Sequence, residues 1–298
     1  MLQRVDDIVN GFLNDLNDQR VLELYKEITS GKKLRAKLIL KIAGQSDEAY
    51  VLAAIVEMIQ VASLLHDDVI DDADTRRGKS SINALFGDKT AIMLGDILYS
   101  KAFYELTSLP EFVAKSISNA VTRLSIGELL DVELSKSFNK NRDRYFDMID
   151  KKTASLIEAS AESAAYLCGK DSKKFALYGK NLGLAFQIID DILDITQDAK
   201  TLGKPALHDF KEGKATLPYI YLYDKLPEDD KVKLENLFKK DLTNEEKNWV
   251  ITNMKRYGAI ENSLELVRDL AMEAIQSIKE YKNSELEKII QDMIQREY

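Results

Sequence analysis

The chain has 298 residues, of which 45% are hydrophobic and 31% charged, a composition typical of a globular protein. Its formal net charge of -8 argues against nucleic acid as a partner, because the phosphate backbone attracts basic proteins. The single cysteine, Cys168, excludes an internal disulfide and is typical of a reducing compartment. We find no secretory signal and no run of about 18 apolar residues. We therefore expect no transmembrane segment and a cytoplasmic location.

Apolar residues recur at helical spacing along almost the whole chain, and the strict alternation that marks strands is scarce. In chain order, the spacing predicts helices over residues 3–17, 20–28, 33–43, 47–71, 90–106, 111–138, 142–167, 172–198, 214–225, 228–239, 243–255 and 259–294, the last of them broken. Breaks are expected at Gly31, 75–89, Pro110, 139–144 and 199–213. No shift in composition marks a boundary. We expect a single all-α domain over residues 1–298, built as one large helical bundle.

Two aspartate motifs share one spacing: Asp67, Asp68 and Asp71 in LLHDDVIDD, and Asp190, Asp191 and Asp194 in IIDDILDI. Carboxylates on an apolar helix face are costly unless a cation meets them. Oxygen ligands favour Mg²⁺, which proteins bind through a few carboxylates together with substrate phosphates. A solvated charge stripe would explain one such motif, but the residues between the aspartates are apolar as well. We therefore predict two motifs that face a central cavity and hold a phosphorylated ligand through Mg²⁺.

Basic residues gather beside both motifs and at two further places. Each cluster alone would be an ordinary solvated loop. Four clusters together with two acidic motifs predict a site for more than one phosphate group, since arginine offers bidentate contacts and lysine a point charge. The clusters are Lys32, Lys33 and Arg35; Arg76, Arg77 and Lys79; Lys152; and Lys204, Lys211 and Lys214.

These segments resemble the trans-isoprenyl (polyprenyl) diphosphate synthases. LLHDDVIDDADTRRGK is similar to the family's first aspartate-rich motif with its trailing arginine pair, and AFQIIDDILDIT to the second with its leading FQ. SGKKLRAKLI is similar to the GGKRxRP segment, and GKPALHDFKEGKATLP to GKxxxxDxxEGKxTLP. The matches run in family order from residue 30 to 218, and the pattern is closest to the octaprenyl diphosphate synthases. Four positions depart from it: Ser30, Lys33, Ala36, and Leu207, where glycine is common.

The resemblance implies the all-α isoprenoid synthase fold, usually a homodimer. It implies a prenyltransferase that condenses isopentenyl diphosphate head-to-tail onto an allylic diphosphate. Three Mg²⁺ ions would be held by Asp67, Asp68, Asp71, Asp190, Asp191 and Asp194. The allylic diphosphate would contact Arg76, Lys152, Thr153, Gln187, Lys204 and Lys214. Isopentenyl diphosphate would contact Lys32, Arg35, Gln60 and Arg77. The residues implied in catalysis are Asp67, Asp68, Asp71, Lys152, Asp190, Asp191 and Lys204.

Product length in this family depends on residues one turn before the first motif. Ala62 and Ser63 stand there, and their small side chains predict an open tunnel and a product longer than farnesyl diphosphate, with octaprenyl diphosphate for a quinone side chain as the best match. Geranylgeranyl or farnesyl diphosphate is the alternative product. Close helix packing would also explain two small residues. Release of a greasy product would allow transient membrane contact.

Three other functions fit parts of the pattern. A terpene cyclase also uses an aspartate motif and Mg²⁺ but generally carries a different second motif. A non-catalytic modulator subunit of a prenyl synthase would typically have lost aspartates, and this chain keeps all six. A di-iron bundle would need Glu-x-x-His pairs, and neither His66 nor His208 has a glutamate three residues before it. We expect both histidines to be structural and the released diphosphate to accept the proton.

Overall fold

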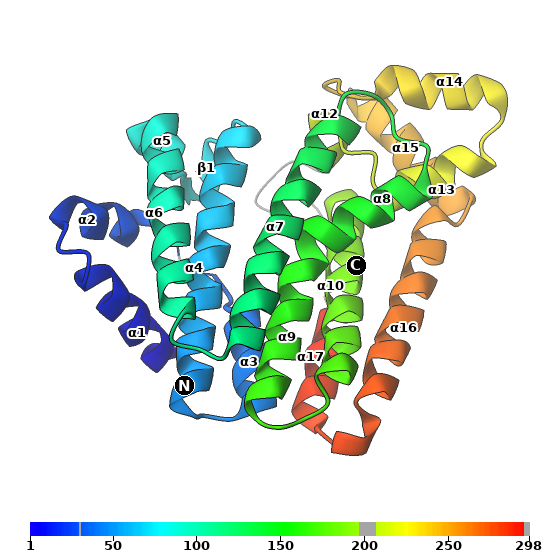
Figure 1. The fold of residues 1–298 in the computed structure, drawn as a ribbon. Coiled ribbons are helices and arrows are strands. Elements are labelled where there is room, and N and C mark those ends of the chain that lie inside the picture. The colour runs from blue at the N-terminus through cyan, green and yellow to red at the C-terminus, as the bar shows by residue number, and fades with distance from the viewer. Residues whose placement is uncertain (30, 197–206, 295–298) are drawn as a thin grey trace. The chain divides into compact units, whose positions relative to one another are not determined.

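The computed structural model describes residues 1–29, 31–196 and 207–294, and within these ranges the chain is almost entirely helical (Figure 1). The all-α class predicted from the spacing is confirmed. The chain divides into two compact units, Met1–Val121 with Leu156–Ala176, and Thr122–Ser155 with Leu177–Tyr298. A single domain over residues 1–298 stays a prediction.

The first unit is organised around one long helix, α4 (Asp47–Ile70), which packs against α1, α3 and α6. The Ser46 hydroxyl caps its start by accepting a hydrogen bond from the Ala49 N–H at 3.2 Å, a contact typical of helix N-termini. Fully buried side chains such as Leu52 and Ile55 line the helix. The other helices of this unit are α1 (Leu2–Asn14), α2 (Gln19–Glu27), α3 (Leu34–Ala43), α5 (Ile82–Phe86) and α6 (Asp88–Leu106), with the first part of α7 (Glu111–Leu134) and most of α9 (Ser155–Leu167).

Among the described residues, α4 is the one helix long and apolar enough by composition to cross a membrane, which the sequence analysis did not expect. Its most apolar stretch is 61% buried inside the protein. Core helices of globular proteins pass the same test, so this is weak evidence for a membrane span. The absence of a transmembrane segment stays a prediction.

The second unit contains the rest of α7, most of α10 and the other helices after residue 141 except α9. They are α8 (Arg142–Ile149), the π-turn η1 (Asp150–Ala154), α10 (Ser172–Thr196), α12 (His208–Glu212), α13 (Leu217–Lys225), α14 (Glu228–Leu237), α15 (Asn244–Arg256), α16 (Ala259–Ser277), the 3-10 turn η2 (Lys279–Tyr281) and α17 (Ser284–Ile294). Aromatic packing anchors the short α12, where Phe210 is fully buried and stacks on Tyr219 with ring centroids 4.4 Å apart.

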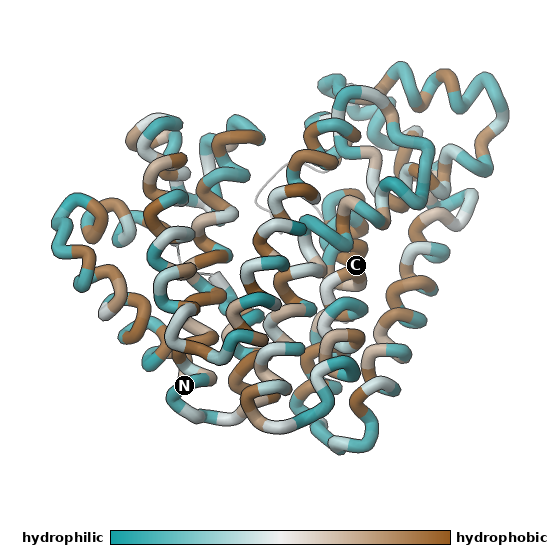
Figure 2. Tube along the Cα trace, in the orientation of Figure 1, coloured by the Kyte–Doolittle hydropathy of each residue, from teal (hydrophilic) through white to brown (hydrophobic). Residues whose placement is uncertain are grey.

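The predicted helices match the observed helices to within a few residues at most of their ends. Figure 2 shows hydrophobic and hydrophilic residues interspersed along these helices. The break expected over 75–89 holds α5 and a hairpin of β1 (Thr75–Arg76) and β2 (Lys79–Ser80). The helix predicted over 142–167 is interrupted by η1, and that predicted over 111–138 ends at Leu134. The break expected within 259–294 is present between α16 and α17.

Candidate active site

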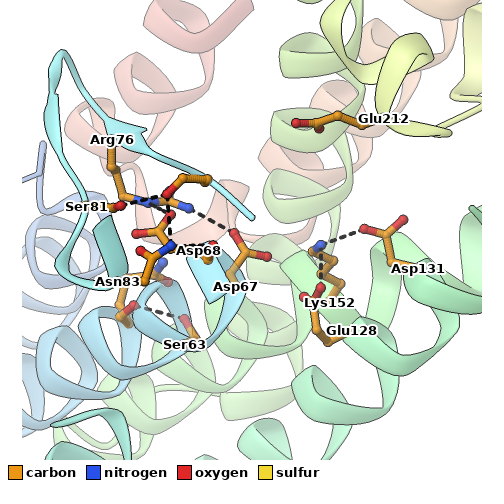
Figure 3. A network of polar contacts seen from close by, with 12 residues as sticks. Ser63, Asp67, Asp68, Arg76, Ser81, Asn83, Glu128, Asp131, Lys152 and Glu212 are labelled. Atoms are coloured by element: carbon orange, nitrogen blue, oxygen red, sulfur yellow. Dashed lines mark hydrogen bonds and ion pairs between the residues drawn. The ribbon is translucent and has the colours of Figure 1, made fainter. Parts of the chain in front are cut away.

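The first aspartate motif, at the end of α4, forms ion pairs with Arg76. The Arg76 guanidinium donates from Nε to Asp68 Oδ1 at 2.6 Å and from Nη2 to Asp67 Oδ2 at 3.0 Å (Figure 3). The Asp68 side chain is 5% exposed and that of Asp67 is 20% exposed. The charge that the apolar helix face could not carry alone is thus compensated in part by arginine.

A tight hairpin places Arg76 over these aspartates. Arg77 and Gly78 form its two-residue turn with φ angles of 54° and 74°, and Arg76 pairs with Lys79 across it. Positive φ at both central positions is the requirement of a type I′ turn, the commonest connection of a two-residue hairpin. The Arg-Gly dipeptide therefore returns the chain toward the end of α4.

Side chains that follow the hairpin fix the segment after the motif. The Ser81 hydroxyl donates to the Ala73 carbonyl at 2.6 Å (Figure 3). The Asn83 amide donates to the same carbonyl at 3.1 Å and to the Asp68 carbonyl at 3.3 Å. These bonds hold the segment after α4 to the start of α5, and the Asp68 carbonyl accepts from the Ala73 N–H as well, at 2.8 Å.

The first motif has the donors that a hard divalent ion requires. Burial raises the pKa of the Asp68 carboxyl, and the neighbouring Arg76 charge opposes this rise. A buried carboxylate of this kind is stabilised by a second cation. Asp71 adds a third carboxylate at the C-cap of α4. Oxygen donors of this number and type fit Mg²⁺.

The predicted isopentenyl diphosphate residues all belong to the first unit. The Arg77 Nη1 donates to the Thr29 carbonyl at 3.2 Å, and its guanidinium lies against Gly31, where a Cβ would come within 2.6 Å of Nη1. The hairpin and the segment before α3 are thus in contact, which places Arg77 beside the start of the lysine-rich segment that holds Lys32.

Arg35 and Gln60 lie on the neighbouring helices α3 and α4. Burial lowers the pKa of Arg35 to about 10, and the nearby Glu57 carboxylate opposes this. Glu57 accepts a hydrogen bond from the Ala36 N–H at 3.2 Å. Among the described residues, Gln60 Oε1 is buried without a hydrogen-bond donor, so it is available to a ligand.

The two residues predicted to set product length differ in exposure. Ala62 is fully buried, whereas Ser63 is partly exposed. The Ser63 hydroxyl donates back to the Gln60 carbonyl at 2.9 Å (Figure 3). Their role in product length stays a prediction.

Of the second motif, on α10, Asp190 is partly exposed while Asp191 and Asp194 are buried. Both carboxylate oxygens of Asp191 accept hydrogen bonds, from the Tyr145 hydroxyl at 2.5 Å and from Gln187 Nε2 at 2.9 Å. Burial raises the pKa of the Asp191 carboxyl well above its usual range, and nearby Asp209 adds to this. Burial likewise raises the pKa of the Tyr145 hydroxyl, which therefore remains a donor.

Asp194 holds the start of α12. Its Oδ2 accepts from the Asp209 N–H at 3.1 Å, and its carbonyl accepts from the Leu207 N–H at 2.9 Å. Leu207 has a φ of 61°, in the left-handed region that favours glycine. Leu207 stands where glycine is common in the family. It keeps the backbone conformation that favours glycine, and its side chain is buried.

Lys152 lies in the π-turn η1 and is held by two carboxylates of α7. Its Nζ is 3.0 Å from Glu128 Oε1 and 2.6 Å from Asp131 Oδ2 (Figure 3). Gly127 on α7 allows η1 to lie close to that helix, since a Cβ at Gly127 would lie 2.2 Å from the backbone nitrogen of Lys152. π-turns occur frequently at functional sites, and this one presents the predicted diphosphate ligand.

Thr153 and Gln187, both predicted to contact the allylic diphosphate, contact one another. The Thr153 hydroxyl donates to Gln187 Oε1 at 2.7 Å. Lys214 follows α12 and donates to Glu212 Oε2 at 3.1 Å. Ser30 and Lys204 lie outside the described residues, so the role of Lys204 stays a prediction.

A further group of possible metal ligands lies on α12. Within the described ranges, His208, Asp209 and Glu212 place ligand atoms within 4.8 Å of one another. We expected His208 to be structural, and the sequence did not predict this group. The Glu212 carboxylate accepts from Lys214, and the Asp209 backbone N–H donates to the Asp194 carboxylate.

The aspartates and Lys152 were predictable from the sequence, but the side chains that contact them were not. Tyr145 is far in sequence from Asp191, and Glu128 and Asp131 are far from Lys152. No local spacing links these residues to the groups that they contact. The GELLD run of α7 offered a weak signal, because Gly127, Glu128 and Asp131 are neighbours on one helical turn. The joint action of the two motifs on one ligand stays a prediction.

This chain is similar to known proteins in sequence and in fold over most of its length. The family model described as polyprenyl synthetase matches residues 18–254. A crystal structure of octaprenyl pyrophosphate synthase from Helicobacter pylori has a TM-score of 0.95 and 47% sequence identity, over 99% of this chain and 98% of that one.

Two curated proteins differ in the products for which they are named. Solanesyl-diphosphate synthase 1 of Oryza sativa is 38% identical over 80% of this chain, and the match spans 56% of the rice protein. Geranylgeranyl diphosphate synthase of Sulfolobus acidocaldarius is 34% identical over 87% of this chain and 83% of that protein.

Proposed function

This chain belongs to the polyprenyl synthetase family, and we propose that it condenses isopentenyl diphosphate head-to-tail onto an allylic diphosphate, giving an all-trans polyprenyl diphosphate. The observation that carries this proposal is the pairing of Asp67 and Asp68 with Arg76, the first arginine after the motif. A modulator subunit would have lost aspartates, whereas all six are present.

The aspartates of the two motifs would hold Mg²⁺, with three ions expected. When bound, the ions neutralise negative charge on the departing diphosphate. Asp67, Asp68 and Asp71 fit this role through their oxygen donors, and Asp190 is the partly exposed member of the second motif.

The chain's own cations would hold the two substrates. Arg76 and Lys152 would bind the allylic diphosphate, and each is already oriented by carboxylates of neighbouring turns. Arg35 and Arg77 would bind isopentenyl diphosphate from the first unit. An ion pair at about 4 Å contributes roughly 4 kcal/mol at an effective dielectric constant of 20. A few such contacts supply a substantial part of a typical enzymatic barrier reduction of roughly 8–23 kcal/mol.

Breaking the allylic carbon–oxygen bond leaves a cation, which the double bond of isopentenyl diphosphate attacks before a proton is lost. Water must be excluded, and the apolar residues around each motif serve that purpose. His66 is not placed as a base, because its Nε2 lies 3.1 Å from the Ile92 carbonyl on α6. The released diphosphate is the proton acceptor, so His66→Ala should keep kcat within a few-fold of wild type in a steady-state assay. A loss of several orders of magnitude would assign the proton to His66.

The product proposed is longer than farnesyl diphosphate, with octaprenyl diphosphate the best match. Small side chains at Ala62 and Ser63 and the similarity to proteins named for octaprenyl and solanesyl products support this. The Sulfolobus relative is named for a geranylgeranyl product, which keeps that length as the alternative.

We also propose a cytoplasmic homodimer that contacts membranes transiently when it releases product. Exposed apolar side chains on α6 support self-association, with Met93 53% and Tyr104 68% exposed. On α7, Leu129 is 60% exposed. Light scattering of the purified protein should give twice the monomer mass of 33.8 kDa, and a monomer at micromolar concentration would contradict this assembly.

Incubation of the purified protein with Mg²⁺, isopentenyl diphosphate and radiolabelled farnesyl diphosphate tests the activity. We expect chromatography to show label in chains longer than farnesyl, and none in reactions with excess chelator. Cyclised hydrocarbon products would favour a terpene cyclase. Unchanged label under conditions that preserve the fold would contradict the proposed reaction.

A further inference from the structure

Each carboxylate oxygen of Asp191 accepts a hydrogen bond from a neutral donor. The side chain is buried, and the Tyr145 hydroxyl and the Gln187 amide each donate to a different oxygen, at 2.5 and 2.9 Å. The Tyr145 hydroxyl is the donor of this bond, so its phenolic proton points toward Asp191 Oδ2. This geometry is that of an anchor within the protein.

The contacts continue beyond Asp191 to the π-turn. Gln187 Oε1 accepts from the Thr153 hydroxyl at 2.7 Å, so the amide is used on both sides. Four side chains from α8, η1 and α10 thereby form one chain of hydrogen bonds, and the orientation of each is set by the next. Loss of one bond in such a network affects the others, because each donor orients its acceptor.

The network ends at groups placed in the reaction above. Thr153 follows Lys152 in η1, and Asp190 precedes Asp191 on α10. Tyr145 itself is 1% exposed and packs edge-to-face on Phe146, with centroids 5.5 Å apart. The Tyr145 hydroxyl can therefore affect the substrate only by orienting other residues.

We propose that Tyr145 is a positioning residue for the diphosphate end of α10: its hydroxyl holds Asp191, and through it keeps Gln187, Thr153 and Asp190 in place. Asp191 accordingly acts as the internal anchor of the second motif, and Asp190 faces the ligand. This inference rests on the proposed function.

Tyr145→Phe tests the role, because it removes the hydroxyl and keeps the ring. Tyr178→Phe is the matched control. Tyr178 lies on α10 and is also buried, and its hydroxyl donates a hydrogen bond to the Leu286 carbonyl at 2.9 Å. Two quantities are measured: steady-state kcat and KM for both substrates, and calorimetric binding of inorganic pyrophosphate in the presence of Mg²⁺. Thermal unfolding of both variants reports the structural cost.

We expect Tyr145→Phe to lower kcat and the Mg²⁺-dependent affinity for pyrophosphate by about 10- to 100-fold, the range of one hydrogen bond to a charged acceptor. The KM for isopentenyl diphosphate should stay within about twofold, because its residues lie in the first unit. Tyr178→Phe should match wild type in both readouts while losing similar thermal stability. In a double variant with Asp191→Asn, the losses should not add, since the two groups act through one bond.

If wild type forms product and binds magnesium pyrophosphate, but Tyr145→Phe matches Tyr178→Phe in both, the positioning role is wrong and the proposed function stands. Additive losses in the double variant would also overturn it. A folded wild type that neither forms product nor binds magnesium pyrophosphate overturns the proposed function and this inference together.

Discussion

Replacement of Gly127 by alanine should displace the π-turn that carries Lys152. A Cβ at this position would lie 2.2 Å from the Lys152 nitrogen and 2.7 Å from the Lys151 carbonyl carbon, both backbone atoms. Ordinary contact begins at 3.4 Å, so the turn and α7 must separate by about 1.2 Å. No flexible side chain can absorb this displacement.

The cost follows from the rigidity of both neighbours. Overpacking of this kind destabilises proteins by about 1–3 kcal/mol. In a chain of this size each kcal/mol lowers Tm by about 2–4 °C, which gives a fall of about 2–12 °C. Displacement of a substrate-positioning group by about 1 Å lowers activity by roughly 100-fold. Lys152 Nζ would also leave Glu128 and Asp131, now 3.0 and 2.6 Å away.

Differential scanning calorimetry and steady-state kinetics measure the two effects. Gly11→Ala is the control, because nothing lies within 4 Å of a Cβ at that exposed position of α1. It should stabilise the protein by about 0.5–1 kcal/mol and leave kcat unchanged. Wild-type Tm and kcat in Gly127→Ala would refute the packing of η1 against α7.

Three further changes test separate parts of the site. Arg76→Ala leaves Asp68 without its guanidinium, so Mg²⁺ should raise Tm more in this variant than in wild type; equal shifts in a thermal melt would count against exchange of arginine for metal. Burial raises the pKa of Glu57 above 4.5, so the folded state binds its proton more tightly and the free energy of unfolding falls as pH rises from about 4.5 through that raised pKa. Glu57→Gln should remove this fall in denaturant titrations across pH, and parallel wild-type and variant curves would exclude it. Ala62→Tyr should shorten the product measured by chromatography. An unchanged product length would show that Ala62 does not line the tunnel.

The helices were predictable because a 3.6-residue apolar period recurs along the chain, and their caps agree with simple rules such as Ser46 before α4. The π-turn was not, because one extra residue per turn leaves the apolar pattern of 142–167 almost unchanged. The hairpin had a usable signal in Arg77-Gly78, yet its strands are only two residues long. Residues 208–212 are too short to show helical periodicity.

The aspartates of the site were predictable because charge at that spacing conflicts with apolar neighbours. Their partners were not, since Tyr145 and Asp191 stand 46 residues apart and meet only in the folded chain. For the same reason the spacing could not separate Asp191, whose oxygens are both engaged, from Asp190, which is partly exposed. Tertiary contacts, rather than sequence spacing, decide which carboxylate of a motif is buried and hydrogen-bonded within the protein.

A crystal structure with Mg²⁺ and an unreactive thio analogue of farnesyl diphosphate tests the central claim most directly. We expect ions that join a single diphosphate to carboxylates of Asp67 and Asp71 on one side and of Asp190 on the other. Motifs that bind ions in separate cavities, or that face bulk solvent with the analogue bound elsewhere, would contradict the account.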